Sequence, residues 1–422
     1  MGKVFESLVL DIIQLAFKHI LDEEQHGFIS GRSTVTNLLC FQNHVLDAFS
    51  RSNQVDAIYV DFSKAFDRIS HSHLRAKLGA YGINGPLLHW FHSYLTDRQQ
   101  TVKFATKKSK PFVPTSGVPQ GSHLGLFLLT VFINDVVQCL NSRCLLFADD
   151  IKLYCEINTA ADCMALQAAL DQLILWCYQN EMAINPAKTR AITFHRKLNP
   201  ICEDYLVDDL PLERCSSIKD LGVILEASLD PALHINSICS RASRSLGFVL
   251  RMGRCGFENS TLVTLYKTLV RPIMEYASVV WSLHQVGQIG RVQSLQRRFI
   301  RILGLRLGYT YTEVPVSALE NILDLLPLDG RRKVMDLVML YKILNSRIDC
   351  PSLLHCVNIR VPTGTRTQQL FERGNHSRNY LYHSPISRML RWGNEVCPCV
   401  DFFGDGVGAF PHVAVSAASG ED

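Results

Sequence analysis

Carboxylate residues follow apolar segments at two places in the chain, and folding could bring them into one site. Asp61 comes directly after the strand-like segment 57–60. Asp149 and Asp150, 88 residues further on, lie between the apolar runs 144–147 and 151–154. Two apolar runs joined by a short polar turn predict a β-hairpin with an acidic tip. A strand that ends in Asp61 beside this hairpin would gather three carboxylates.

Grouped carboxylate oxygens bind hard divalent cations. Two such cations about 4 Å apart can hold the attacking and leaving oxygens of a phosphoryl transfer, which is the chemistry of a polymerase active site. Aspartates are also common in solvated turns, and Asp61 could simply cap the end of its strand. The assignment therefore depends on the motifs around the carboxylates.

The composition indicates an ordinary globular protein of two to three domains. The chain has 422 residues, 47% apolar and 19% charged, with a net charge of +4. The longest charge-free apolar run near the middle, 124–133, is about half of what a membrane span needs, and the N-terminus lacks a signal-peptide pattern. The 14 cysteines show no framework spacing. We expect an intracellular protein of the nucleus or cytoplasm, with reduced thiols and no membrane segment.

Hydrophobic periodicity predicts the elements that must position the carboxylates. We expect helices at about 34–50, 71–80 and 160–182, strands at 99–104, 110–114, 190–194 and 218–225, and mainly helix from 230 onward. The segment 124–140 is apolar nearly all round and predicts a buried helix. The stretch 400–422 is rich in small residues and is expected to fray after about 400.

Six short motifs follow one another in a recognisable order. They are Gln25-His26-Gly27-Phe28 with Gly31-Arg32-Ser33-Thr34, Val60-Asp61-Phe62-Ser63-Lys64-Ala65-Phe66-Asp67, Gly117-Val118-Pro119-Gln120-Gly121, Phe147-Ala148-Asp149-Asp150, Asn185-Pro186-Ala187-Lys188-Thr189 and Lys219-Asp220-Leu221-Gly222. In this order they resemble the reverse transcriptases of non-LTR retrotransposons, most closely the insect-type, jockey-like elements. The resemblance covers about residues 3–306.

The resemblance implies an α+β fold, namely a right-hand polymerase with helical fingers, an antiparallel-sheet palm and a helical thumb. We expect fingers and palm in 1–225, the thumb in 226–306 and a helical C-terminal extension of unknown role in 307–422. The family normally begins earlier, with a further fingers segment, so this chain resembles an N-terminally truncated copy.

Catalytic roles are carried over by position. The resemblance implies that Asp61 and Asp149 bind metal, with Asp150 as the third carboxylate, and that the cofactor is two Mg²⁺ ions, with Mn²⁺ as a substitute. Lys188 matches the residue proposed to protonate the pyrophosphate leaving group. The alternative for Lys188 is an exposed loop lysine.

Nucleotide binding is assigned in the same way. Phe66 matches the residue that closes over the sugar, where a ring would clash with a 2′-hydroxyl. Gln120 and Gly121 would lie beside the incoming base pair, and Arg32 and Lys64 could meet triphosphate oxygens. The alternatives are a core phenylalanine, a plain turn and ordinary surface charges.

Basic residues gather in the thumb-like stretch. Residues 237–306 contain eleven Lys and Arg against two Glu. Such segregation predicts a surface that follows a nucleic-acid backbone, although a solvated helix face could look similar. The residues that we assign to nucleic-acid binding are Arg241, Arg244, Arg251, Arg254, Arg297, Arg298 and Arg301.

The prediction is an RNA-directed DNA polymerase that transfers a nucleotide from a dNTP to a primer 3′-hydroxyl. Its partners are an RNA template, a DNA primer and dNTPs, and the sequence predicts no separate protein partner. One alternative is a truncated, catalytically silent remnant that at most binds nucleic acid. Another is a metal-dependent nuclease, which the sequence disfavours because no further His, Asp or Glu cluster is available to activate water.

Overall fold

The computed structural model describes residues 2–360, 369–374, 376, 378–404, 410 and 414–415, and the chain divides into two compact units. The first unit comprises Met1–Asn37 and Arg51–Ser216. The second comprises Leu38–Ser50 and Ser217–Asp422. The predicted fraying after about residue 400 falls largely outside the described residues. Among the described helices, none combines the length and apolarity that crossing a bilayer requires.

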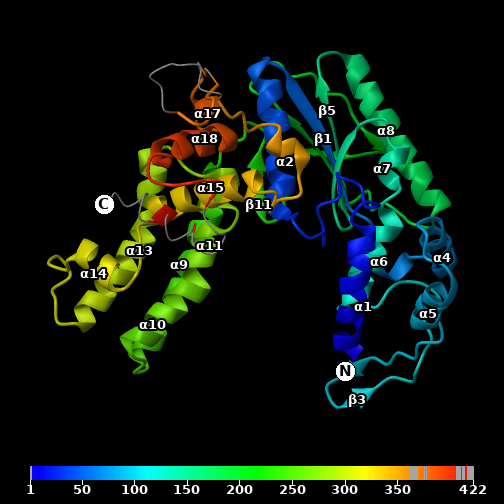
Figure 1. The fold of residues 1–422 in the computed structure, drawn as a ribbon, viewed down its shortest axis with the longest axis horizontal. Helices are drawn as coiled ribbons and strands as arrows, with labels where there is room; N and C mark the ends of the chain where they lie inside the picture. Colours follow the sequence, from blue (N-terminus) through cyan, green and yellow to red (C-terminus); the bar gives the residue numbers. More distant parts are fainter. Residues whose placement is uncertain are drawn as a thin grey trace. The chain divides into compact units, whose positions relative to one another are not determined.

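A five-stranded sheet forms the centre of the first unit (Figure 1). Its strand order is β4-β5-β1-β6-β9, with β6 and β9 parallel and the other pairs antiparallel. The strands are β4 Arg143–Phe147, β5 Asp150–Ile157, β1 Gln54–Val60, β6 Arg190–Phe194 and β9 Glu213–Cys215. The predicted antiparallel sheet and the predicted strand 190–194 are confirmed.

Helices supply the apolar layer that packs against this sheet. The buried core joins sheet residues such as Ile58 and Leu153 to Phe132 of α6 (His123–Ile133) and Trp176 of α8 (Ala160–Gln179). Both helices were predicted, but the expected helix 124–140 is interrupted, and α7 is the separate short helix Val136–Cys139. The break follows from Asn134, whose side chain bonds the backbone of Ile20 and Asp22.

The remaining elements of the first unit are mostly helical. They are α1 Gly2–Phe17, α3 Ala65–Arg68, α4 His71–Ala80 and α5 Gly85–Leu95, with the short pairs β2 Lys103–Phe104 with β3 Lys107–Lys108 and β7 Leu206–Val207 with β8 Leu210–Pro211. The predicted helix 71–80 is confirmed. The predicted strands 99–104 and 110–114 reduce to β2, β3 and an isolated bridge between Gln100 and Phe112.

The second unit is mainly helical, as predicted for the residues after 230. Its elements are β10 Ser217–Asp220, β11 Val223–Glu226, α9 Ala232–Arg254, α10 Asn259–Leu265, η1 Tyr266–Val270, α11 Arg271–Glu275, α12 Ser278–Trp281, α13 Val286–Arg306, α14 Val316–Ile322, α15 Leu328–Leu344, α16 Pro351–Leu354, α17 Asn379–Tyr382 and α18 Pro385–Val396. The helix α2 (Thr34–Ser50) matches its predicted range and contributes its residues from Leu38 onward to this unit.

The predicted strand 218–225 is instead a tight hairpin of β10 and β11. Leu221 and Gly222, with φ of 43° and 91°, form its turn. A glycine adopts this left-handed conformation without strain, so the Leu-Gly pair can reverse the chain where a single extended strand was expected.

Candidate active site

The acidic hairpin tip forms as predicted. β4 and β5 pair in a register that places Phe147 opposite Asp150, and Ala148 and Asp149 make the two-residue turn. Ala148 adopts φ of 55°, in the left-handed region that tight hairpin turns use. Asp149 is half-buried, and Asp150 is exposed at the first position of β5.

Asp61 comes to the same edge of the sheet. β1 ends at Val60, which pairs with Ile151 of β5. Asp61 is the next residue after this last pair, so it lies beside the hairpin tip. Its backbone is held by the segment after α8, since the Asn185 amide donates to the Asp61 carbonyl at 2.7 Å and the Asp61 amide donates to Thr189 Oγ1 at 3.3 Å. Its side chain remains 38% exposed. The strand-end carboxylate is therefore fixed in place and open to solvent.

The two carboxylates influence each other electrostatically. Burial raises the pKa of Asp149 above its ordinary value, and the negative charge of Asp61 raises this pKa further, against a backbone hydrogen bond that lowers it. A divalent cation between them would relieve this repulsion, and carboxylate oxygens are ligands that Mg²⁺ prefers. The residues present therefore fit a hard divalent ion.

The carboxylates do not form a closed cage. Within the described parts of the chain, the ligand oxygens of Asp61, Asp149 and Asp150 do not all lie within 4.8 Å of one another. Mg²⁺ is commonly held by one or two carboxylates together with substrate phosphates and water, so an open arrangement suits an ion that arrives with a nucleotide.

Lys188 lies beside the predicted metal ligand. Its Nζ is 3.6 Å from Asp61 Oδ2, and its side chain is 67% exposed. The Lys188 amide donates to the Asn185 carbonyl at 3.1 Å, and the Asn185 amide is bonded to Asp61, so one short turn carries both contacts. The structure thus brings the predicted general acid next to the predicted carboxylate site.

The hairpin tip rests on a segment that the sequence analysis did not assign to the site. Gln25 Oε1 accepts hydrogen bonds from the amides of Gly27 at 2.7 Å and Ala148 at 3.1 Å, while Gln25 Nε2 donates to the Ala148 carbonyl at 3.3 Å. At Gly27, an added Cβ would lie 2.3 Å from Ala148 N. The signal for both positioning residues was the Gln25-His26-Gly27-Phe28 motif, whose partner could not be identified without the fold.

The loop 117–121 packs against the segment that carries Phe66. The Val118 amide donates to the Phe66 carbonyl at 2.8 Å, and Gly117, at φ of 87°, leaves no room for a side chain beside Asp67. Gln120 is exposed and donates from Nε2 to Asp67 Oδ1 at 3.4 Å. Phe66 itself is only partly buried against the core. The predicted nucleotide-contacting residues Phe66 and Gln120 therefore share one structural support.

The two predicted phosphate-binding cations occupy different settings. Lys64 is exposed at φ of 55°, immediately before α3. Arg32 is half-buried, and its Nη1 donates to the carbonyl of Asp22 at 2.6 Å and to that of Gln25 at 2.8 Å. Arg32 thus holds the loop that carries Gln25. Gly121 lies at φ of 76°, a backbone conformation that glycine adopts without strain.

The predicted nucleic-acid-binding arginines lie on two helices of the second unit. Arg241, Arg244, Arg251 and Arg254 are exposed on α9, and Arg297, Arg298 and Arg301 lie on α13. Their spacing along each helix keeps them within one side of it. Within the part of the chain that the structure describes, none of the seven forms an ion pair, although Arg301 lies over the Tyr311 ring at 5.2 Å. These charges are free to meet phosphates.

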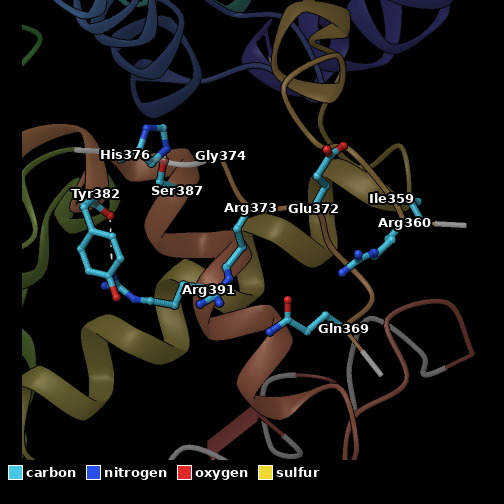
Figure 2. A pocket seen from close by; sticks show the side chains of 10 residues that line it. All are labelled: Ile359, Arg360, Gln369, Glu372, Arg373, Gly374, His376, Tyr382, Ser387 and Arg391. Carbon is cyan, nitrogen blue, oxygen red and sulfur yellow. Dashed lines mark hydrogen bonds between the residues drawn. The ribbon is translucent and has the colours of Figure 1, made fainter. Parts of the chain in front are cut away.

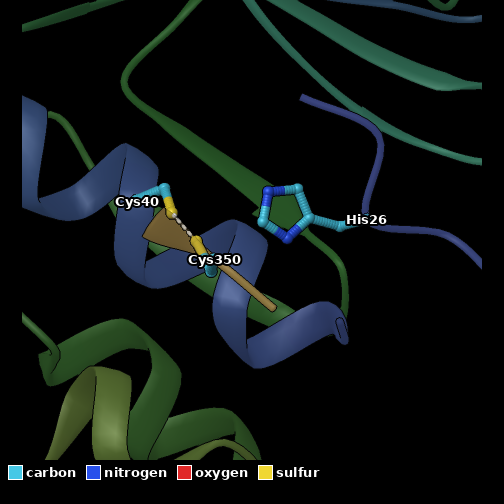
Figure 3. A group of neighbouring side chains, drawn as sticks. All are labelled: His26, Cys40 and Cys350. Atoms are coloured by element: carbon cyan, nitrogen blue, oxygen red, sulfur yellow. Dashed lines mark hydrogen bonds between the residues drawn. The ribbon is translucent and has the colours of Figure 1, made fainter. Parts of the chain in front are cut away.

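The described residues include all 14 cysteines, and no disulfide bond joins any two of them. Cys40 of α2 and Cys350, just before α16, lie in the second unit with their Sγ atoms 3.2 Å apart (Figure 3). Figure 3 also draws His26, which belongs to the first unit, where its Nδ1 lies 2.8 Å from Thr36 Oγ1. Burial, together with Arg32 and Lys152, lowers the pKa of His26 to about 3, so its ring is neutral at pH 7.

Comparison with known proteins agrees with this geometry. A family model described as "Reverse transcriptase (RNA-dependent DNA polymerase)" matches residues 1–225, which contain all three carboxylates. The chain belongs to the reverse transcriptase family. Members of this family use divalent metal ions, and the carboxylate edge of the sheet offers ligands for them.

Curated relatives come from insect mobile elements. The probable RNA-directed DNA polymerase from transposon BS of Drosophila melanogaster is 30% identical over 72% of this chain and 35% of its own length. The probable enzyme from transposon X-element of the same species is 28% identical over 72% of this chain and 34% of its own length. The RNA-directed DNA polymerase from mobile element jockey of Drosophila funebris is 26% identical over 71% of this chain and 34% of its own length. The chain thus spans about a third of the length of these relatives.

Among solved structures, apo telomerase from Candida tropicalis aligns over 79% of this chain and 54% of its own, with a TM-score of 0.45 and 10% identity. The assignment of the right-hand polymerase architecture rests on the family match, together with the antiparallel sheet and the helices described above.

Proposed function

We propose that this chain is an RNA-directed DNA polymerase of a non-LTR retrotransposon, which transfers a nucleotide from a dNTP to a primer 3′-hydroxyl. The observation that carries the proposal is the joint position of Asp61 and Asp149 at one edge of the sheet, inside the region that the family model matches. The insect relatives are named as RNA-directed DNA polymerases, which supports the same reaction.

The proposed chemistry assigns a task to each carboxylate. Asp61, Asp149 and Asp150 would hold two Mg²⁺ ions, for which Mn²⁺ can substitute, and these ions supply charge stabilisation for the attacking and leaving oxygens. Asp61 and Asp149 are held by backbone contacts and by the hairpin turn, so little reorganisation is needed when a nucleotide binds.

Lys188 is proposed as the general acid. The reaction forms a bond between the primer O3′ and the α-phosphorus, breaks the bond from this phosphorus to pyrophosphate, and releases the hydroxyl proton of the primer to solvent. The Lys188 ammonium, exposed and 3.6 Å from Asp61, would give a proton to the departing pyrophosphate oxygen.

The nucleotide would lie over the segment 64–67 and the loop 117–121. In this proposal the Phe66 ring excludes a 2′-hydroxyl, and Gln120 and Gly121 contact the incoming base pair. Lys64 would meet the triphosphate directly. Arg32 could contribute only part of its guanidinium, since Nη1 already bonds two loop carbonyls.

Nucleic acid would bind through the arginines of α9 and α13. We propose that 226–306 act as the thumb, that 1–225 form fingers and palm, and that 307–422 are a C-terminal extension of these domains. The partners would be an RNA template and a DNA primer, held by sugar–phosphate contacts with little base readout. Copying RNA into DNA for insertion would take place inside the cell, in the nucleus or cytoplasm.

Primer extension tests the proposal. Wild-type protein is expected to incorporate dTTP on an oligo(dT)-primed poly(rA) template when Mg²⁺ is present. Asp149→Asn should lower the rate by more than about 100-fold, because it removes a metal ligand. Asp171→Asn, an exposed carboxylate on α8, is the matched control and should keep the rate. Folded wild-type protein that binds RNA without incorporation would instead support the non-catalytic remnant.

A further inference from the structure

A second cationic site lies in the C-terminal part of the second unit, outside the proposed polymerase site. Residues 359–360, 369 and 372–374 and the helices α17 and α18 line a cavity of about 640 Å³ (Figure 2). This volume is in the range of small-molecule binding pockets. Three arginines line it, Arg360, Arg373 and Arg391, against the single carboxylate Glu372. The cavity therefore has a net positive lining.

Arg391 is the anchored member of this set. It is only 9% exposed, and it lies 4.3 Å from the ring centre of Tyr382 and 4.9 Å from that of Trp392. Its Nη1 donates to the Tyr382 carbonyl at 3.4 Å. Across the residues that the structure describes, Arg391 has no carboxylate partner. Arginines this buried are almost always paired with an acid, so an anion would complete the environment of Arg391.

Arg360 and Arg373 supply the exposed positive charge of the cavity. Both are exposed, and neither side chain forms a hydrogen bond or ion pair with another described residue. Figure 2 shows both guanidinium groups directed into the space that Gln369 also borders, whereas the Glu372 carboxylate extends away from it. Planar guanidinium groups bind phosphate oxygens in pairs, and Gln369 can donate a further hydrogen bond.

We propose that this arginine pocket binds backbone phosphates of a single-stranded nucleic acid. Three guanidinium groups around one cavity suit a phosphodiester ligand better than they suit a ligand with a single carboxylate. A single strand can enter a cavity of this size, whereas a duplex is too wide. The pocket would add a contact beyond the polymerase site, suited to an unpaired RNA segment. The choice of nucleic acid rests on membership of the reverse transcriptase family.

Fluorescence anisotropy with a labelled oligo(U) RNA tests the pocket, in the absence of dNTPs and metal. Arg360→Ala combined with Arg373→Ala should weaken binding several-fold and reduce the slope of log affinity against log salt by about 1.4, about 0.7 for each lost contact. Lys342→Ala combined with Arg347→Ala, two exposed cations outside the pocket, removes the same charge and should keep the wild-type slope.

Three results would overturn the inference. The first is an equal loss of affinity in the two double variants, which would mean that only net charge matters. The second is unchanged RNA binding in the pocket variant. The third is an equally large loss for an RNA duplex, which would remove the preference for a single strand. The binding measurement does not involve polymerisation. It therefore still tests the arginine pocket if the polymerase proposal fails.

Discussion

At the scale of single residues, the site depends on two carboxylates and on small groups that hold their backbone. Asp149 belongs to a turn that contacts Gln25 and Gly27 through Ala148. The backbone of Asp61 is held by hydrogen bonds with Asn185 and Thr189. The carboxylates themselves could be selected from sequence, because acidic residues between apolar runs are a local signal. The supporting contacts join residues more than a hundred positions apart and required the fold.

Asp149→Asn should leave the protein at least as stable as the wild type at pH 7. The pKa of Asp149 is raised in the folded chain, so its ionised form destabilises folding once the pH exceeds the ordinary carboxyl value of 3.8. A neutral amide of the same shape removes this effect and the repulsion from Asp61. Thermal denaturation checks the prediction, and a clearly lower midpoint in the variant would contradict it.

Gly27→Ala should destabilise the first unit by about 1–3 kcal/mol and reduce polymerisation, because a Cβ would lie 2.3 Å from Ala148 N. Gly79→Ala is the matched control, since a Cβ there meets nothing within 4 Å and helix α4 gains a better helix former. Urea denaturation of both variants measures the difference. Equal stability of the two would show that the hairpin tip does not rest on Gly27.

At the scale of elements, the helices α2, α4 and α8 could be predicted from hydrophobic periodicity, because their apolar faces repeat along the local sequence. The acidic hairpin could be predicted from two apolar runs joined by a polar turn. The prediction of one helix over 124–140 was wrong between Ile133 and Val136, where tertiary contacts outweigh the hydrophobic pattern. Asn134 bonds the Ile20 and Asp22 backbone, and Asp135 accepts from Lys77 Nζ at 2.7 Å and Trp176 Nε1 at 3.1 Å. None of these partners is near in sequence.

Asp162→Ala should cost about 0.5–2 kcal/mol at pH 7, since Asp162 completes the capping box of α8 by accepting from the amides of Asn158 at 2.9 Å and Thr159 at 2.8 Å. These bonds lower its pKa, so the stabilisation exists above its ordinary value of 3.8 and is lost as the pH falls through the lowered value. Denaturation at several pH values checks this, with Asp171→Ala as the control. A difference that stays constant into strong acid would contradict the capping role.

At the scale of the whole molecule, residues 307–422 acquire a structural role that the sequence did not reveal. Arg388 of α18 bonds Asp336 of α15 through Nε at 2.6 Å and Nη2 at 3.2 Å, and Nη2 also donates to the Val279 carbonyl of α12 at 2.6 Å. One buried arginine therefore joins the C-terminal extension to the thumb-like helices. No short sequence pattern predicts this junction, because its three residues lie far apart in the chain.

Arg388→Met should destabilise the second unit by about 3–5 kcal/mol, because it removes the guanidinium that bonds the buried Asp336 carboxylate. Lys333→Met is the matched control. It breaks the more exposed Lys333–Glu395 pair between the same two helices, at 3.2 Å, and should cost no more than about 1 kcal/mol. Hydrogen exchange of α12 and α15 reports the effect. Equal protection in the two variants would rule out the buried pair as the junction.

The central claim is that the edge formed by Asp61 and Asp149 carries out RNA-templated nucleotidyl transfer. Its most direct test is the single-turnover rate of one dTTP addition to an oligo(dT) primer on poly(rA), for wild type, Asp61→Asn and Asp171→Asn. We expect metal-dependent addition by the wild type and by Asp171→Asn, and a loss of more than about 100-fold in Asp61→Asn. Addition by Asp61→Asn at the wild-type rate would contradict the account.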